Sequence, residues 1–290
     1  MPALPTSTRR RLTRVAESGA RRVLPPPDPA GRRVVLCYHS VDPRPNYLGL
    51  TPDLFDAHLA WLEEHCQVVS LDELVAEPRR SGGPYVAITF DDGYADNHEF
   101  ALPLLVDHGI EATFFLTAGL VDQDRPTLER FKYLRNVDEE MIRPLQWTQV
   151  AEMLQAGMQI GAHSYTHPNL AGLDGSELAY EVAHSKRIVE DRIGHDISTM
   201  AYPFGRPKVH VTQPVLEAVG RAGFGFACTT VTRGVQARDQ PLGIPRFIAT
   251  QNPVEVLREK VLGTWDLVGT LRERAPLKIA RMVSPIDFEF

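Results

Sequence analysis

The stretch YVAITFDDGY, residues 85–94, joins a strand-like run to two adjacent aspartates and a glycine. A short run of β-branched and aromatic residues predicts a buried strand. Asp91 and Asp92 follow at its end, where two neighbouring carboxylates repel each other unless a cation compensates at least one of them. The stretch therefore predicts a strand of a buried sheet that carries two carboxylates to the edge of that sheet.

Similar apolar runs recur along the chain and alternate with amphipathic segments, which is the pattern of repeated βα units around a parallel sheet. We expect about eight strands, over residues 33–39, 66–71, 85–90, 112–118, 158–164, 199–204, 224–230 and 243–249.

Helices are expected between these strands. Thr51 and Pro52 supply an N-cap and a first-turn proline, and the segments 147–157 and 176–194 each end at a glycine that can stop a helix. The segment 119–146 is charged and irregular, and we expect it to form a surface excursion near a site or a partner.

Composition restricts the class of protein. A chain of 290 residues is long enough for one large α/β domain or two small ones, and 43% hydrophobic and 23% charged residues are typical of a soluble globular protein. The formal net charge is −6 although residues 1–33 are rich in arginine, so the rest of the chain is acidic, which argues against a nucleic-acid partner. Three cysteines without a CxxC spacing indicate neither a disulfide framework nor a thiolate zinc site.

No apolar run reaches the roughly 18–20 residues of a membrane-spanning helix, and the first residues lack the pattern of a secretory signal. We therefore expect a cytoplasmic protein without a transmembrane segment. The basic, proline-rich arm is expected to be disordered, with peripheral contact to an anionic membrane face as the alternative.

Polar side chains follow several predicted strands. His39 follows the first strand, Asp91 and Asp92 the third, and His163 and His167 the fifth. The carboxyl ends of parallel strands converge at one edge of a sheet or barrel, where active sites are built. We therefore expect these residues to meet.

Two histidines four residues apart suit two bonds to one metal ion, although two hydrogen-bonded loop histidines are an equal alternative for His163 and His167 alone. A solvated turn is the alternative for the aspartate pair. Together they predict one carboxylate and two imidazoles on a divalent ion, with zinc expected first and cobalt, nickel or iron also accepted. The second carboxylate can then act as base on water, which indicates a hydrolase.

The motifs TFDDGY (89–94), HSYTHP (163–168) and AYPFG (201–205) together resemble the polysaccharide deacetylases of carbohydrate esterase family 4, the NodB-homology fold. The resemblance implies an α/β fold, a distorted (β/α) barrel of about seven parallel strands in a single domain. It also implies removal of acetyl groups from N-acetylated sugars.

The resemblance also implies roles for single residues. Asp91 would be the general base, and Asp92, His163 and His167 would bind the metal. The backbone N–H of Phe204 would help to hold the oxyanion, and Tyr202 and Phe204 would shape the floor of the substrate groove.

Two departures from the family pattern concern the groups around the base. Ala201 stands where many members have an arginine that orients the base, and no late Leu-x-His motif is evident. In both features the chain resembles the circularly permuted subgroup that deacetylates exopolysaccharides and poly-N-acetylglucosamine. In that subgroup the histidine of an early Tyr-His pair supplies the general acid. This implies His39 as the acid, with a hydrogen-bonded histidine that closes a strand as the alternative. Arg246 is expected either to pair with Asp91 or to hold the barrel closed.

The sequence thus predicts three parts: a basic arm at 1–32, a deacetylase barrel at 33–263 and a C-terminal helical tail at 264–290. The predicted function is metal-dependent N-deacetylation of an N-acetylhexosamine in a poly- or oligosaccharide or glycoconjugate. The alternatives are hydrolysis of a cyclic amide or imide on the same fold, and an inactive sugar-binding domain. The helical histidines, among them His58, are expected at the surface.

Overall fold

A computed structural model of the chain describes residues 30–45, 48–76, 82–135 and 142–274. Within these residues, no helix has the length and apolar character needed to cross a bilayer. The greater part of the predicted arm 1–32, and of the predicted tail 264–290 the part beyond residue 274, lie outside the described residues, so the three-part division stays a prediction.

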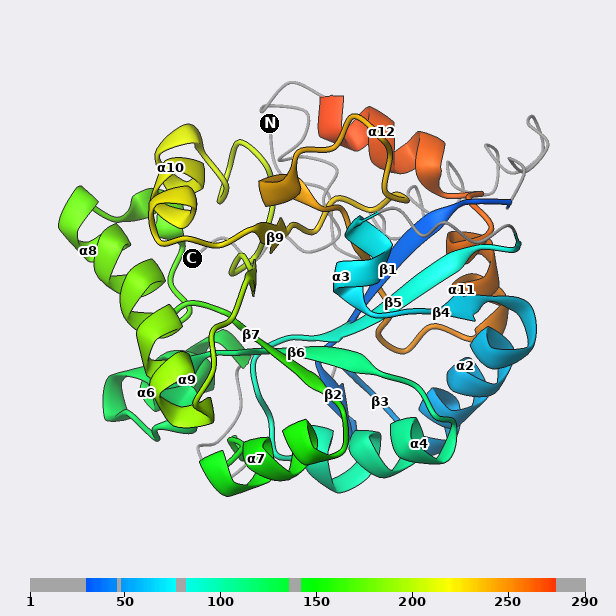
Figure 1. Cartoon of the computed structure of the whole chain (residues 1–290), viewed down its shortest axis with the longest axis horizontal. Helices are drawn as coiled ribbons and strands as arrows, with labels where there is room; N and C mark the ends of the chain where they lie inside the picture. The colour runs from blue at the N-terminus through cyan, green and yellow to red at the C-terminus, as the bar shows by residue number, and fades with distance from the viewer. Residues whose placement is uncertain (1–29, 46–47, 77–81, 136–141, 275–290) are drawn as a thin grey trace, which may run out of the picture.

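A curved parallel sheet forms the centre of the fold (Figure 1). Its seven-strand path runs β10-β1-β5-β6-β7-β8-β9 and curls through 243° into a half-barrel. The strands are β1 (Arg33–Tyr38), β5 (Tyr85–Phe90), β6 (Ala112–Leu116), β7 (Gln159–Ala162), β8 (Thr199–Ala201), β9 (Phe226–Cys228) and β10 (Phe247–Ile248), and β4 (Gln67–Val68) also pairs with β5. All eight predicted strands are present and the predicted distorted barrel is confirmed, although most strands are shorter than their apolar runs.

Helices surround the outer side of the sheet (Figure 1). They are α2 (Pro52–His65), α3 (Leu71–Val75), η1 (Asn97–Ala101), α4 (Leu102–Asp107), α5 (Ala118–Val121), α6 (Arg125–Arg135), α7 (Trp147–Gln155), η3 (Leu170–Gly172), α8 (Gly175–Ala179), η4 (Tyr180–His184), α9 (Ser185–Ile193), α10 (Gln213–Arg221), η5 (Pro241–Gly243), α11 (Val254–Val261) and α12 (Asp266–Arg274). A small separate sheet pairs β2 (Ser40–Val41) with β3 (Gly49–Leu50).

The predicted helix starts and stops follow from local chemistry. The Thr51 hydroxyl accepts a hydrogen bond from the N–H of Leu54, and a proline occupies the first turn of α2. Gly194 ends α9 in the left-handed conformation that glycine adopts without steric penalty.

The expectation of a surface position for His58 is wrong. His58 is fully buried, because it shares the inner face of α2 with Phe55, Leu59 and Leu62. Its ring nitrogens lie 3.1 Å from the Tyr38 hydroxyl and 2.7 Å from the carbonyl oxygen of Asn252. Two polar partners make this burial possible, since a buried polar group needs hydrogen bonds.

The expectation of an irregular segment over 119–146 is also wrong in part. The helices α5 and α6 occupy its first half. The apolar residues of α6 recur at helical spacing, and Phe131 is fully buried. The segment does lie near the predicted site, because the ring centroid of Phe131 is 5.3 Å from that of His167.

The register of β1 and β5 positions the site. Cys37 pairs with Thr89 and Tyr38 pairs with Phe90, and the N–H of Asp91 donates to the carbonyl of Tyr38 at 3.0 Å. Because the two strands are parallel and end together, His39 and Asp91 leave the sheet at the same level. The sheet edge therefore gathers the residues that follow these strands.

Candidate active site

Three side chains that follow β5 and β7 form a compact donor set. Asp92, His163 and His167 are 0%, 2% and 4% exposed. Asp92 Oδ1 lies 3.6 Å from Nε2 of His163 and 3.5 Å from Nε2 of His167. These distances exceed a normal hydrogen bond. They agree with the separation of about 3.4 Å between two ligands of one tetrahedral zinc ion with bonds of about 2.1 Å.

The backbone around this donor set adopts an uncommon conformation. Asp92, Ser164, His167 and Phe204 all have positive φ, at 79°, 62°, 58° and 60°. Such conformations are unfavourable for residues with a Cβ and cluster at functional sites, where the surrounding structure enforces them. Part of that enforcement is the hydrogen bond from the N–H of His167 to the Ser164 hydroxyl, at 3.0 Å.

A backbone carbonyl group fixes the orientation of the His163 ring. Its Nδ1 lies 2.8 Å from the carbonyl oxygen of Ala201. A carbonyl can only accept, so Nδ1 carries the proton and Nε2 has its lone pair directed toward Asp92 and His167. This is the tautomer that a metal-binding histidine requires.

Glu181, which no motif in the sequence identifies, holds the loop between the two histidines. Its Oε2 accepts hydrogen bonds from the N–H groups of Tyr165 at 2.9 Å and Thr166 at 2.8 Å, and its Oε1 accepts from the Thr166 hydroxyl at 2.6 Å. The available signal was a glutamate in the helical segment 176–194 that follows the HSYTHP motif, which is too common a pattern to identify it.

Asp91 is held by a buried arginine. Nη1 and Nη2 of Arg246 donate to Oδ1 and Oδ2 of Asp91, each at 2.7 Å, and Arg246 is fully buried. Nη1 also donates to the Thr89 hydroxyl at 3.1 Å, and Nε donates to the Thr229 carbonyl at 3.2 Å. Of the two roles expected for Arg246, the pairing with Asp91 is therefore present, and Arg246 reaches the carboxylate from the position just before β10 instead of from that of Ala201.

This ion pair decides the charge of Asp91. Burial by itself raises the pKa of the carboxyl, but the Arg246 guanidinium opposes this and that pKa lies at about 2. Asp91 is therefore a carboxylate at neutral pH.

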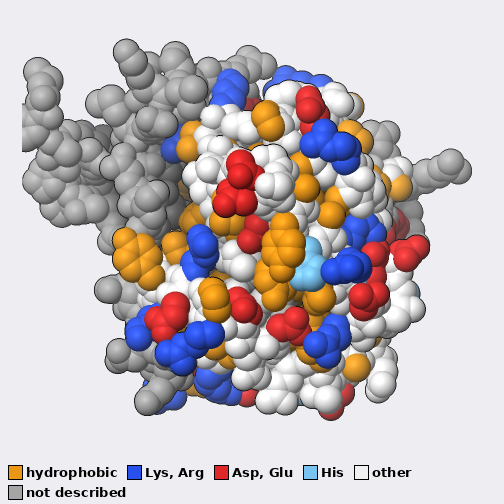
Figure 2. Space-filling view, turned by 90° about the vertical axis from the view of Figure 1, so that its left-hand side faces the viewer, with side chains coloured by type: hydrophobic (Ala, Val, Ile, Leu, Met, Phe, Trp, Pro, Cys, Tyr) orange, Lys and Arg blue, Asp and Glu red, His pale blue; other side chains and the backbone are white. Residues whose placement is uncertain are grey.

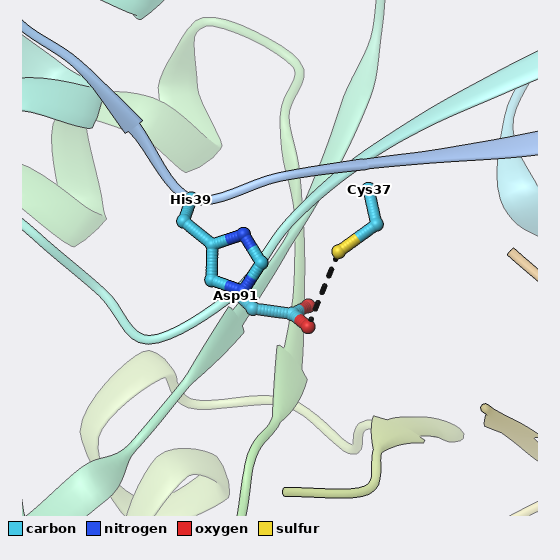
Figure 3. Close-up of side chains that lie close together, drawn as sticks. All are labelled: Cys37, His39 and Asp91. Atoms are coloured by element: carbon cyan, nitrogen blue, oxygen red, sulfur yellow. Dashed lines mark hydrogen bonds between the residues drawn. The ribbon is translucent and has the colours of Figure 1, made fainter. Parts of the chain in front are cut away.

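His39 and Cys37 also lie beside Asp91 (Figure 3). His39 is half-buried, and one ring nitrogen of His39, the Cys37 sulfur and one Asp91 oxygen all lie within 4.8 Å of one another. The sequence predicted His39 at this place and did not predict a site contact for Cys37.

The AYPFG motif contributes a backbone N–H group to the site and no polar side chain. The ring centroid of Phe204 lies 4.9 Å from that of His167. Within the described residues, the Phe204 N–H donates no hydrogen bond to another protein group, so it remains available as a donor. Tyr202 is 1% exposed and its hydroxyl donates to the Leu242 carbonyl at 3.0 Å, so it supports this loop from below. Its predicted place on a groove floor stays a prediction.

An open groove of about 420 Å³ lies beside the histidine loop. Its lining includes Pro168, which directly follows His167, together with Arg130 and the half-exposed Tyr180. The face that carries α8 and α9 has acidic and basic side chains interspersed with hydrophobic ones (Figure 2). The surface beside the site is therefore mixed in charge.

Comparison with known proteins gives consistent matches. The sequence model described as polysaccharide deacetylase matches residues 79–226, just over half of the chain. The chain is 29% identical over 210 residues to the Bacillus subtilis protein YxkH, with 71% of this chain and 67% of that protein covered. It is 22% identical over 224 residues to a poly-β-1,6-N-acetyl-D-glucosamine N-deacetylase of Staphylococcus aureus, with 73% and 70% covered.

A solved structure extends the likeness to the fold. The Streptococcus pyogenes deacetylase PplD in complex with acetate aligns with a TM-score of 0.67 at 23% identity, over 79% of this chain and 98% of that chain. At this level of identity the match establishes a common fold.

Proposed function

The chain belongs to the polysaccharide deacetylase family, whose members hydrolyse the amide C–N bond of acetylated sugars, and from this premise we propose that it is a metal-dependent N-deacetylase of an N-acetylhexosamine unit. The unit would belong to a poly- or oligosaccharide or a glycoconjugate. One observation carries the proposal: a donor set of Asp92, His163 and His167 with metal-ligand spacing lies beside a carboxylate, Asp91, that a buried arginine holds ionised.

Asp92, His163 and His167 would hold one divalent ion, with zinc expected first and cobalt, nickel or iron compatible with the same donors. When bound, the ion would act as a Lewis acid that lowers the pKa of water, which a carboxylate as weakly basic as Asp91 requires.

Asp91 would accept the proton from the attacking water. The Arg246 fork fixes the plane of the carboxylate and keeps it ionised, so the base is oriented before the substrate arrives. The fork occupies the role that an arginine at the position of Ala201 has in many relatives.

Two further groups would act on the acetamide. The Phe204 N–H would donate a hydrogen bond to the oxyanion, because the positive φ of Phe204 leaves that N–H without an acceptor among the described residues. His39 would protonate the departing amine, since one of its ring nitrogens lies within 4.8 Å of an Asp91 oxygen.

The groove beside the histidine loop supports a saccharide substrate longer than one sugar. Tyr180 lines this groove and is 52% exposed, and an exposed tyrosine ring offers an apolar face for a sugar together with a polar hydroxyl. The Staphylococcus aureus relative, named as a poly-β-1,6-N-acetyl-D-glucosamine N-deacetylase, favours the same substrate class.

The experiment is a metal-dependent acetate-release assay across N-acetylglucosamine, its nucleotide conjugate and short oligomers. We expect release that needs added metal and that Asp91→Asn abolishes while the metal content stays near wild type. His39→Ala should lower kcat strongly with little loss of metal. Unchanged activity of Asp91→Asn would refute the proposed base, and ring opening of a cyclic imide without acetate release would refute the proposed reaction.

A further inference from the structure

We propose that Cys37 is a positioning residue of this active site, whose thiol donates a hydrogen bond to Oδ2 of Asp91 and thereby selects Oδ1 as the oxygen that accepts the proton from water. The inference rests on the proposed function, because it takes Asp91 as the base.

The strand places the thiol beside the base. Cys37 and His39 are two residues apart at the end of β1, so their side chains leave the strand on the same side. Both approach Asp91, which follows the neighbouring strand β5 (Figure 3). Cys37 Sγ lies 3.4 Å from Asp91 Oδ2, and Cys37 is fully buried.

The thiol is the donor in this contact. Burial and then the neighbouring Asp91 carboxylate raise the pKa of Cys37 well above its ordinary value, although Arg246 opposes this. A protonated thiol has one hydrogen, and the alternative acceptor, the Tyr38 carbonyl oxygen, lies farther away at 3.8 Å. The carboxylate is both nearer and charged, so it is the stronger acceptor.

This bond makes the two oxygens of Asp91 unequal. Arg246 donates once to each oxygen. Cys37 adds a second donor to Oδ2, so Oδ2 has two hydrogen bonds and Oδ1 has one among the described residues. Each carboxylate oxygen accepts about two hydrogen bonds, so Oδ1 retains the free acceptor position for water.

A second metal site at Cys37, His39 and Asp91 is the competing interpretation of this cluster. It is unfavourable, because the Arg246 guanidinium already donates to both oxygens of Asp91 from a fully buried position. A cation bound there would have to displace or adjoin that buried positive charge.

The test compares Cys37→Ala, Cys37→Ser and a matched control, Cys228→Ala. Cys228 is a second fully buried thiol, on β9, for which no hydrogen bond to Asp91 is found. Loss of one such hydrogen bond to the base should lower kcat of Cys37→Ala by roughly three- to tenfold, with KM within about twofold of wild type. Cys37→Ser retains a donor and should recover more than half of that loss on a logarithmic scale. Cys228→Ala should leave kcat within about twofold of wild type.

Metal content and thermal unfolding are measured for every variant, so a loss of metal or fold is separated from a loss of rate. Equal kcat losses in Cys37→Ala and Cys228→Ala, or no rescue by serine, would overturn the positioning role. Unchanged kcat in Cys37→Ala, with Asp91→Asn inactive, would refute the role of Cys37 and leave the proposed function standing. Activity retained in Asp91→Asn would instead refute the proposed function.

Discussion

Replacement of Arg246 by methionine tests the most consequential contact in the site. Arg246→Met fills much of the same volume and leaves the Asp91 carboxylate, 3% exposed, without its counter-charge. Burial then raises the pKa of Asp91 from about 2, because the Arg246 guanidinium, which lowers that pKa most, has been removed.

The magnitude follows from the burial of both partners. Removal of one partner from a buried ion pair destabilises a protein by about 3–5 kcal/mol, because the remaining charge is left uncompensated. A misoriented or protonated general base forfeits roughly 10²–10⁴-fold in rate. We therefore expect a large loss of both unfolding free energy and kcat in Arg246→Met.

The assays are urea unfolding followed by circular dichroism, and acetate release at saturating metal. Arg233→Met is the matched control: Arg233 is 2% exposed and pairs with Asp239 at 2.7 Å and Glu273 at 2.9 Å, neither of which belongs to the donor set. It should lose comparable stability with kcat unchanged. The double variant Asp91→Asn/Arg246→Met removes both charges and should recover most of the lost stability but no activity.

Two results would refute this reasoning. A urea midpoint of Arg246→Met equal to that of the wild type would mean that the ion pair contributes no net stability. A double variant no more stable than Arg246→Met would mean that the loss arises from packing and not from an unpaired carboxylate.

Two further predictions concern metal binding and acid stability. Asp92→Asn should purify with well under one equivalent of metal while Asp91→Asn retains a full equivalent, because Asp92 is the aspartate that faces both histidines. Metal analysis after dialysis measures this content. Equal metal content in both variants would contradict the donor assignment. Burial lowers the pKa of His58 from 6.5 to about 4, so the stability that its neutral ring provides is present above pH 6.5 and is lost as the pH falls to 4. His58→Gln should therefore narrow the difference in unfolding free energy between pH 7 and pH 4 by about 3 kcal/mol relative to wild type, whereas His65→Gln, exposed on the same helix, should not.

Local patterns predicted much of the fold. The apolar runs located all eight strands, because a strand buried on both faces needs a continuous run of apolar residues. Capping residues and terminal glycines located α2, α7 and the helix that ends at Gly194. The paired aspartates and the two histidines could be singled out because residue type and spacing alone carry that signal.

Contacts between residues that are far apart in the sequence could not be predicted as well. The sequence left two roles open for Arg246, and only the structure shows that it pairs with Asp91, which is 155 residues away along the chain. Glu181 carried only a signal too common to identify it, and Cys37 carried none. His58 lay on a predicted apolar face, but its partners at Tyr38 and Asn252 come from other elements, so its burial was not predicted.

The sequence by itself therefore determined where the strands lie along the chain, the parallel α/β class and the candidate metal ligands, since these depend on periodicity and on motifs a few residues long. The tertiary structure decided how Asp91 is held, with Arg246 reaching it from the position just before β10 and Cys37 from β1. The physical reason is that the curl of the sheet brings β10 and β5 to either side of β1. No local pattern records that adjacency.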